Sequence, residues 1–188
     1  MSERLKEKYK KEVVPSLMKD FKIKNPMAVA YIQKITVNSG IGSLKDNREN
    51  IESFRSELSL LLGQVPMVRK AKKSISAFKL REGEPIGISA TLRGDRMWAF
   101  LDKLISIVLP RVKDFRGVSL NSFDSQGNYA LGLDDHTIFP EVNPNKVRIG
   151  RGLQVNIVLK SPSKEQSKAL LAGLGFPFEK KEKEATRL

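Results

Sequence analysis

The chain has 188 residues, of which 40% are hydrophobic, and its 34 Lys and Arg against 21 Asp and Glu give a formal net charge of +13. This length suits one domain, and this apolar content can bury a core, which excludes a disordered chain. The charge favours nucleic acid over a membrane surface as partner, because a bound polyphosphate releases counterions. The lack of cysteine excludes disulfides, Cys-ligated metals and thiol catalysis.

The chain contains no feature of a membrane or secreted protein. No run approaches roughly 18 consecutive apolar residues, and residues 1–20 are charged throughout, without the apolar core of a signal peptide. We therefore expect a cytoplasmic protein with no membrane partner. We expect one domain over residues 1–178, followed by a charged, disordered tail over residues 179–188.

The first third of the chain predicts a helix, a strand and a second helix. Apolar residues at four-residue steps predict an amphipathic helix, and this stripe is Leu5, Tyr9, Val13, Leu17 and Phe21. Residues 31–38 then alternate as in a half-buried strand. Its apolar side is Tyr31, Ile35 and Val37, and its polar side is Lys34, Thr36 and Asn38. Asp46 and Glu49 resemble a capping box that opens a helix, which Gly63 ends.

A basic stretch separates this helix from the next strand. Residues 67–81 contain no acid and lead into a turn at residues 82–85, which predicts two strand ends joined by a mobile basic loop. Residues 86–93 alternate again, with Ser89, Thr91 and Arg93 on the polar side. Gly94 and Asp95 should cap a helix over residues 96–109, ended by Pro110.

The second half predicts loops, one strand and one helix. Periodicity fades over residues 111–151, which indicates long loops and short strand pieces, and residues 153–159 form the last alternating strand. Ser163 and Gln166 make a capping box for a helix that ends at Gly173 and Gly175. The order of elements predicts an α+β fold, in which helices pack on one face of a mainly antiparallel sheet and leave the other face free.

Catalytic and metal-binding patterns are weak. The lone histidine, His136, has no second His or Cys ligand, so we expect it on the surface or in a loop, with no metal and no role. The segment from Asn38 to Gly42 holds the Gly-x-Gly of a dinucleotide-binding turn, but Lys45 stands where the third glycine belongs. A nucleotide-binding enzyme is therefore a remote alternative, and we expect no enzymatic activity and no cofactor.

Two groups of residues are candidates for contact with nucleic acid. The predicted free face carries short hydrogen-bonding side chains flanked by cations: Lys34, Thr36, Asn38, Ser89, Thr91 and Arg93. The basic loop offers cations for phosphates and one aromatic ring: Lys70, Lys72, Lys73, Ser74, Phe78, Lys79 and Arg81. Phe78 either stacks on a base or packs on the sheet.

Several collinear strings resemble one family. They include Ile35-Thr36-Val37-Asn38, Thr91-Leu92-Arg93-Gly94-Asp95-Arg96-Met97-Trp98, Asp114-Phe115-Arg116-Gly117, Gly127-Asn128-Tyr129 and Ile138-Phe139-Pro140-Glu141. In this order, and over nearly the whole chain, they resemble the fifth ribosomal protein of the large subunit, in its bacterial branch. Leu62 and Arg69 depart from the family signature.

The resemblance implies a structural, cytoplasmic protein of the ribosome's central protuberance that binds 5S rRNA. Its implied partners are 5S rRNA, 23S rRNA, other 5S-associated large-subunit proteins, the P-site tRNA and small-subunit ribosomal protein thirteen. Asn38, Gln64 and Thr91 match the family positions that hydrogen-bond RNA. The loop over residues 71–85 resembles the tRNA-contacting loop. Residues 111–141 resemble the bridge to the small subunit, with Arg111, Asp114 and Arg116 as its contacts. A general nucleic-acid-binding protein is the other alternative.

Overall fold

An open five-stranded sheet organises the protein, whose computed structural model describes residues 2–42, 47–142 and 150–179. The strands lie in the order β2-β3-β1-β5-β4, and every neighbouring pair is antiparallel. Their bounds are β1 (Tyr31–Gly40), β2 (Met67–Lys70), β3 (Pro85–Leu92), β4 (Tyr129–Leu133) and β5 (Leu153–Lys160). The predicted α+β class and antiparallel sheet are confirmed.

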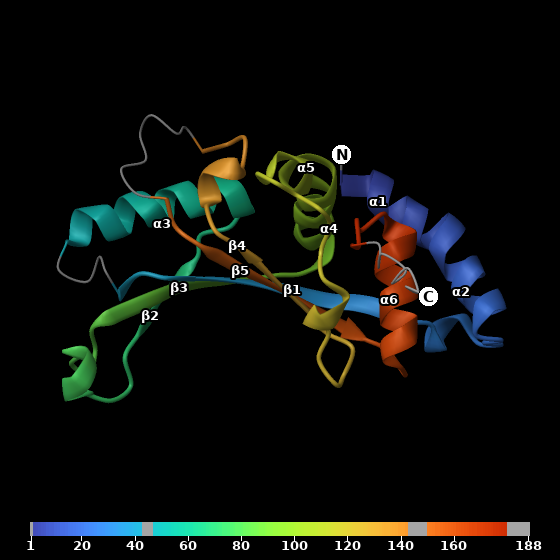
Figure 1. Ribbon diagram of the computed structural model, residues 1–188, viewed down its shortest axis with the longest axis horizontal. Helices are drawn as coiled ribbons and strands as arrows, with labels where there is room; N and C mark the ends of the chain where they lie inside the picture. Colours follow the sequence, from blue (N-terminus) through green and yellow to red (C-terminus); the bar gives the residue numbers. More distant parts are fainter. Residues whose placement is uncertain (1, 43–46, 143–149, 180–188) are drawn as a thin grey trace, which may run out of the picture.

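The helices lie on one face and at one end of this sheet. Helices α3 (Arg48–Leu62) and α4 (Gly94–Lys103) cover one face, and α6 (Lys164–Leu174) lies beside the N-terminal helix at the end where β1 begins (Figure 1). The buried inner positions of β1, β3 and β5 join the apolar stripes of these helices in one core: Ile35, Val37, Ile88, Leu92, Val155, Ile157, Leu58, Leu101 and Leu104. Within the described residues, every helix is too short or too polar to span a membrane.

Two helices contain a widened turn just before a proline. The predicted N-terminal helix is confirmed as α1 (Ser2–Lys8), the π-turn η1 (Tyr9–Val13) and α2 (Val14–Asp20), with Pro15 two residues after the wide turn. The second case is α4, continued by the π-turn η5 (Leu104–Val108) and α5 (Leu109–Arg111). Because a proline ring clashes with the carbonyl four residues earlier, the wide turn makes room for it. Pro110 therefore does not end its helix, contrary to prediction.

Three predicted helix boundaries need correction. Helix α3 is capped by Asn47, whose side-chain oxygen accepts the N–H of Asn50 at 3.2 Å, while the expected cap Asp46 lies outside the described residues. Helix α4 begins at Gly94 rather than at residue 96. Helix α6 has the predicted Ser163 cap, but it runs through Gly173 and ends at Gly175, whose φ of 96° suits glycine.

A β-bulge reverses the expected orientation of Tyr31. The pairing of β1 with β5 shifts between Ile32 and Lys34, so Gln33 is an extra residue in β1. One extra residue moves the side chains before it to the opposite face. Ile32 is therefore buried and Tyr31 is exposed, and the prediction that Tyr31 shares the apolar side with Ile35 is wrong.

His136 lies in a loop, at the start of the 3-10 turn η7 (His136–Ile138), as predicted for one of its two expected positions, but its side chain is buried in the core. Its side chain is 1% exposed, and its ring meets that of Phe54 edge-on. Its Nδ1 accepts the backbone N–H of Arg151 at 3.1 Å, and its Nε2 lies 3.2 Å from a carboxylate oxygen of Glu57. A histidine with both nitrogens engaged can be buried without an unpaired polar atom, so its role is structural.

Of the stretch predicted as long loops and short strand pieces, residues 111–151, the described part over residues 112–142 contains the short strand β4 within long loops, as predicted, and also two 3-10 turns that were not predicted. Residues 143–149 lie outside the described part of the chain, as do residues 180–188 of the expected tail. The single-domain boundary and the disorder of the tail therefore stay predictions.

The two faces of β5 should respond differently to truncation. Val155 is fully buried, whereas the side chain of Gln154 points to the opposite, exposed face. We expect Val155→Ala to lower the free energy of unfolding by about 2 kcal/mol, since it leaves a cavity in the core. Gln154→Ala should change it by less than about 0.5 kcal/mol. Urea denaturation measures both, and equal losses would contradict the two-faced sheet.

Candidate nucleic-acid interface

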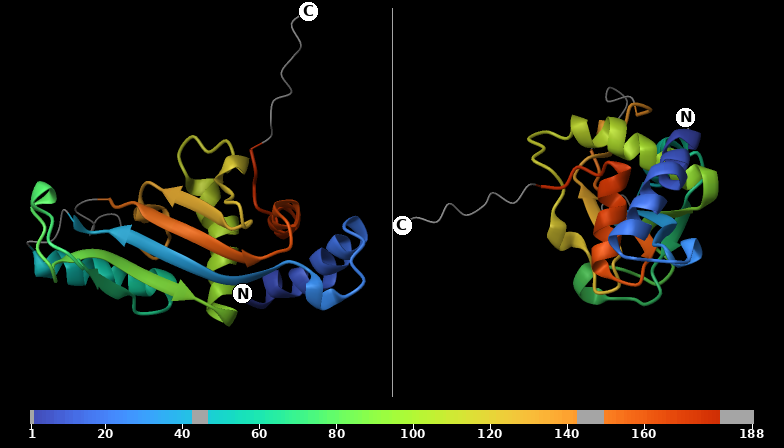
Figure 2. Two further views of the ribbon diagram at one scale, coloured as in Figure 1. Left: turned by 90° about the horizontal axis from the view of Figure 1, so that it is seen from below. Right: turned by 90° about the vertical axis from the view of Figure 1, so that its right-hand side faces the viewer.

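Polar side chains form cross-strand rows on the sheet face opposite the helices. Thr36 of β1 lies opposite Thr91 of β3 and Asn156 of β5. Asn38 lies opposite Ser89 and Gln154 in the same way. Directly opposed residues in antiparallel strands point to the same face and lie within contact distance of one another. The left panel of Figure 2 shows this face of the sheet toward the viewer, with α3 and α4 behind the strands.

The structure brings the predicted face residues together. The cations Lys34 and Arg93 lie beside the rows: Lys34 precedes Thr36 on β1, and Arg93 directly follows β3. Gln64 follows the end of α3 and reaches the same edge, where its Nε2 donates to the Thr91 carbonyl at 3.4 Å. Its side-chain oxygen accepts from Arg96 at 3.4 Å. Three residues matched from the family, Asn38, Gln64 and Thr91, thus lie on or beside one surface. Their RNA contacts remain a prediction.

Sequence reasoning missed three polar residues of this surface. Gln154 and Asn156 extend the rows across β5. Arg69 of β2, which is paired with Gly87, lies beside the row of Ser89, and its Nε donates to Ser89 Oγ at 2.7 Å. The sequence contained the evidence for two of them, because Gln154 and Asn156 alternate with the apolar residues of the strand predicted over residues 153–159. Their significance depended on knowing that β5 is the neighbour of β1.

The basic loop joins two strand ends, as predicted, and forms a hydrogen-bonded hairpin that projects from the sheet; its mobility stays a prediction. The Ala71 N–H donates to the Glu84 carbonyl at 2.8 Å, and Ile75 and Leu80 form a further bridge. In Figure 1 this loop, with the short turn η4 (Ser76–Phe78), extends beyond β2 and away from the helices. Its predicted cations Lys70, Lys72, Lys73, Lys79 and Arg81 are all exposed. The Ser74 hydroxyl accepts the Glu82 N–H at 2.9 Å and so also holds the loop together.

Phe78 lies in the solvent rather than on the sheet. Its side chain is 76% exposed, which decides against the alternative that it packs as a core residue. An exposed aromatic ring among cations can stack on a base while the cations meet phosphates.

The predicted bridge residues lie apart from the open face. Arg111 is the last residue of α5, which lies on the helix-covered side of the sheet (Figure 1). Asp114 and Arg116 are exposed in the turn that follows, where Asp114 has a φ of 53°. A partner that meets these three residues would therefore approach from a different direction than one that meets Asn38.

The arrangement does not support the enzyme alternative. A dinucleotide-binding turn joins a strand to a helix in a parallel sheet, whereas β1 is antiparallel to both of its neighbours. Among the described residues, no cluster of three His, Asp or Glu could hold a metal ion.

An open sheet face with amides, hydroxyls and flanking cations, next to a projecting basic loop, defines a non-catalytic basic protein with a surface suited to nucleic acid. Comparison with known proteins agrees with this description. Residues 25–81 match the family described as Ribosomal protein L5, and residues 85–178 match the ribosomal L5P family C-terminus.

The similar proteins are curated as "Large ribosomal subunit protein uL5". The one from Chloroflexus aurantiacus is 52% identical over 178 residues, which cover 95% of this chain and 99% of the relative. The one from Streptococcus sanguinis is 52% identical, with 96% and 100% covered, and the one from Dictyoglomus turgidum is 53% identical, with 94% and 98% covered. The chain belongs to the ribosomal protein L5 family. It is a structural constituent of the large ribosomal subunit in the cytoplasm and not an enzyme.

The exposure of Phe78 predicts that it contributes little to stability. We expect Phe78→Ala to change the free energy of unfolding by less than about 0.5 kcal/mol. The control, Phe139→Ala, removes a fully buried ring and should cost about 3–5 kcal/mol. Thermal unfolding followed by circular dichroism compares the two, and a large loss for Phe78→Ala would show that the loop ring packs on the protein.

Proposed function

We propose that the protein binds 5S rRNA on its open sheet face and attaches it to the central protuberance of the large subunit. The observation that carries the proposal is the pair of rows in which Thr36 and Asn38 of β1 meet Thr91 and Ser89 of β3, next to Gln64. Short hydroxyl and amide side chains on neighbouring strands are spaced to hydrogen-bond ribose and phosphate oxygens. Such contacts fix the register of an RNA without changing it chemically.

Charge supplies the affinity that these neutral groups lack. The net charge is +13, and Lys34, Arg69 and Arg93 flank the rows. Each phosphate that a cation neutralises releases counterions, so binding should weaken with salt. The neutral rows add contacts that depend on the shape of the RNA and respond less to salt.

Other surfaces are suited to the partners that the family resemblance implies. We infer that the basic loop contacts the P-site tRNA, with Lys72 and Lys73 on phosphates and Phe78 against a base. We infer that residues 111–141, with Arg111 foremost, face small-subunit ribosomal protein thirteen in the head. Contacts with 23S rRNA and with other 5S-associated proteins complete the assembly. The directions of the loop and of α5 support separate partners (Figure 1).

The charge also favours a second candidate, a general nucleic-acid-binding protein. A charge of +13 attracts any RNA, so binding as such does not separate the two functions. A general binder would hold 5S rRNA and an unrelated hairpin of equal length equally well, and salt would weaken both together.

We expect 5S rRNA to bind more tightly than the hairpin, with a preference that persists as salt rises. Asn38→Ala and Thr91→Ala should each weaken 5S binding roughly fivefold, because a hydrogen bond contributes about 1 kcal/mol. The control is Ser56→Ala, an exposed change on α3 behind the sheet. Filter binding at several salt concentrations measures all four proteins. If Asn38→Ala and Thr91→Ala both bind 5S rRNA with wild-type affinity, the assigned site is refuted.

The basic loop should act independently of the 5S site. Lys72→Ala and Lys73→Ala should leave specific 5S binding within about twofold, since both residues lie in the projecting loop. In assembled ribosomes, both variants should reduce crosslinking of this protein to P-site tRNA, because each removes one phosphate-directed charge. Unchanged tRNA crosslinking in the double variant would exclude the loop as the contact.

A further inference from the structure

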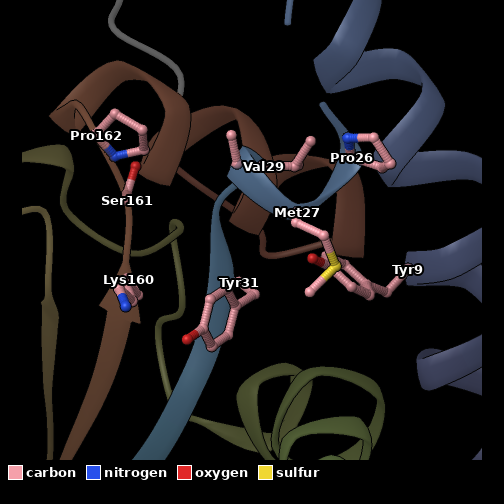
Figure 3. Close-up of a pocket in the computed structure, with 9 residues that line it drawn as sticks. Tyr9, Pro26, Met27, Val29, Tyr31, Lys160, Ser161 and Pro162 are labelled. Carbon is pink, nitrogen blue, oxygen red and sulfur yellow. The ribbon is translucent and has the colours of Figure 1, made fainter. Parts of the chain in front are cut away.

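A pocket of about 760 Å³ lies at the end of the sheet where β1 begins and β5 ends. This size is in the range of sites for small organic groups. Its walls come from the N-terminal helix, the segment before β1 and the end of β5, and they include Tyr9, Met27, Val29, Tyr31, Lys160 and Pro162 (Figure 3). The rows of the open face do not include any of these residues.

The β-bulge in β1 makes the pocket continuous with the open face. Tyr31 pairs with Lys160, and the outward alternates of β5 run from Gln154 through Asn156 to Lys160. Opposed residues share a face, so Tyr31 and Lys160 lie on the same side of the sheet as Asn38 and Thr36. Without the extra residue Gln33, Tyr31 would point into the core.

The walls of the pocket offer flat and adaptable apolar surface. Tyr31 is 38% exposed and Met27 is 86% exposed, and both line the pocket together with Tyr9 (Figure 3). Tyr9 is a fixed wall, because its hydroxyl donates to the Ala30 carbonyl at 3.0 Å and its ring packs 5.6 Å from that of Trp98. Burial raises the pKa of the Tyr9 phenol, so this wall is uncharged at neutral pH. The flexible side chain of Met27 can adjust its shape to a planar ligand.

The charge at the pocket indicates the class of ligand. Lys160 is the only charged residue that lines the pocket, and all of its lining residues belong to the described part of the chain. An aromatic ring beside a cation on a basic surface suits an unpaired nucleotide, whose base stacks and whose phosphate meets the cation. An apolar protein segment in the pocket would offer no negative charge to Lys160.

We propose that this pocket holds an unpaired nucleobase of the ribosomal RNA that lies along the open face. The base stacks on Tyr31 and Met27, and its phosphate contacts Lys160. The inference rests on the proposed RNA-binding function and adds to it a stacking site at the end of the face where β1 begins. Within this arrangement the pocket captures a base that has left the RNA helix, while the polar rows contact its backbone.

Ultraviolet crosslinking followed by mass spectrometry tests the proposal directly. Trypsin releases residues 25–34 as one peptide, bounded by Lys24 and Lys34, and this peptide contains both Met27 and Tyr31. The full chain is irradiated with 5S rRNA and, separately, with fragments of 23S rRNA. We expect a nucleotide adduct on this peptide with at least one of the two RNAs. No adduct on it with either RNA overturns the inference, including the case in which a protein segment fills the pocket.

Variants of Tyr31 give a second readout. Tyr31→Ala should abolish the adduct and weaken binding of the crosslinked RNA about tenfold, whereas Tyr31→Phe keeps the stacking ring and should preserve both. The matched control is Gln33→Ala, an exposed change in the same bulge that does not line the pocket. Wild-type affinity and adduct yield in Tyr31→Ala would overturn the inference.

The outcomes separate this inference from the proposed function. If 5S rRNA binds specifically but neither 5S rRNA nor the 23S rRNA fragments label the peptide, the nucleobase site is refuted and the 5S function stands. If only 23S rRNA fragments label the peptide and 5S rRNA shows no preference, the nucleobase site stands and the 5S proposal fails.

Discussion

The two-residue period of the strands is the constraint on which the rest of the structure depends. Ile35 and Val37 of the central strand β1 are buried beneath the helices, so Thr36 and Asn38 must point the other way. The same holds in β3 and β5, and antiparallel pairing then sets the outward residues of all three strands side by side. Because the helices use one face of the sheet for the core, the opposite face is available to a partner. The core and the proposed RNA-binding surface therefore use alternate residues of the same strands.

The open face combines two kinds of group that would contribute differently to the proposed RNA binding. Cations such as Lys34 and those of the basic loop attract any polyphosphate, and their contribution falls as salt rises. Neutral groups such as Asn38 and Thr91 add little long-range attraction, but their fixed spacing distinguishes one RNA shape from another. A protein that must hold one particular RNA needs both, since cations alone would not discriminate.

Two local irregularities extend this surface at its ends. At one end, the bulge at Gln33 turns Tyr31 outward and connects the open face with the pocket beside Lys160. At the other end, the backbone bridge between Ile75 and Leu80 holds the basic loop in a defined shape and leaves Phe78 in the solvent. Both features lie outside the regular strand pairing of the sheet. Bulges and loops are the places where the chain can redirect a side chain.

The sequence by itself determined the fold class, the polar faces of β1 and β3 and the basic loop, because these depend on local periodicity and charge. It misplaced Tyr31 and did not reveal that the loop residue His136 is buried, since a bulge and a buried polar contact depend on distant partners. These are Lys160 for Tyr31, and Glu57 and Arg151 for His136. Residues such as Gln154 also gained meaning only from the strand order. Tertiary structure decided which strands are neighbours and hence which side chains share a surface, because cross-strand pairing joins residues that are far apart along the chain.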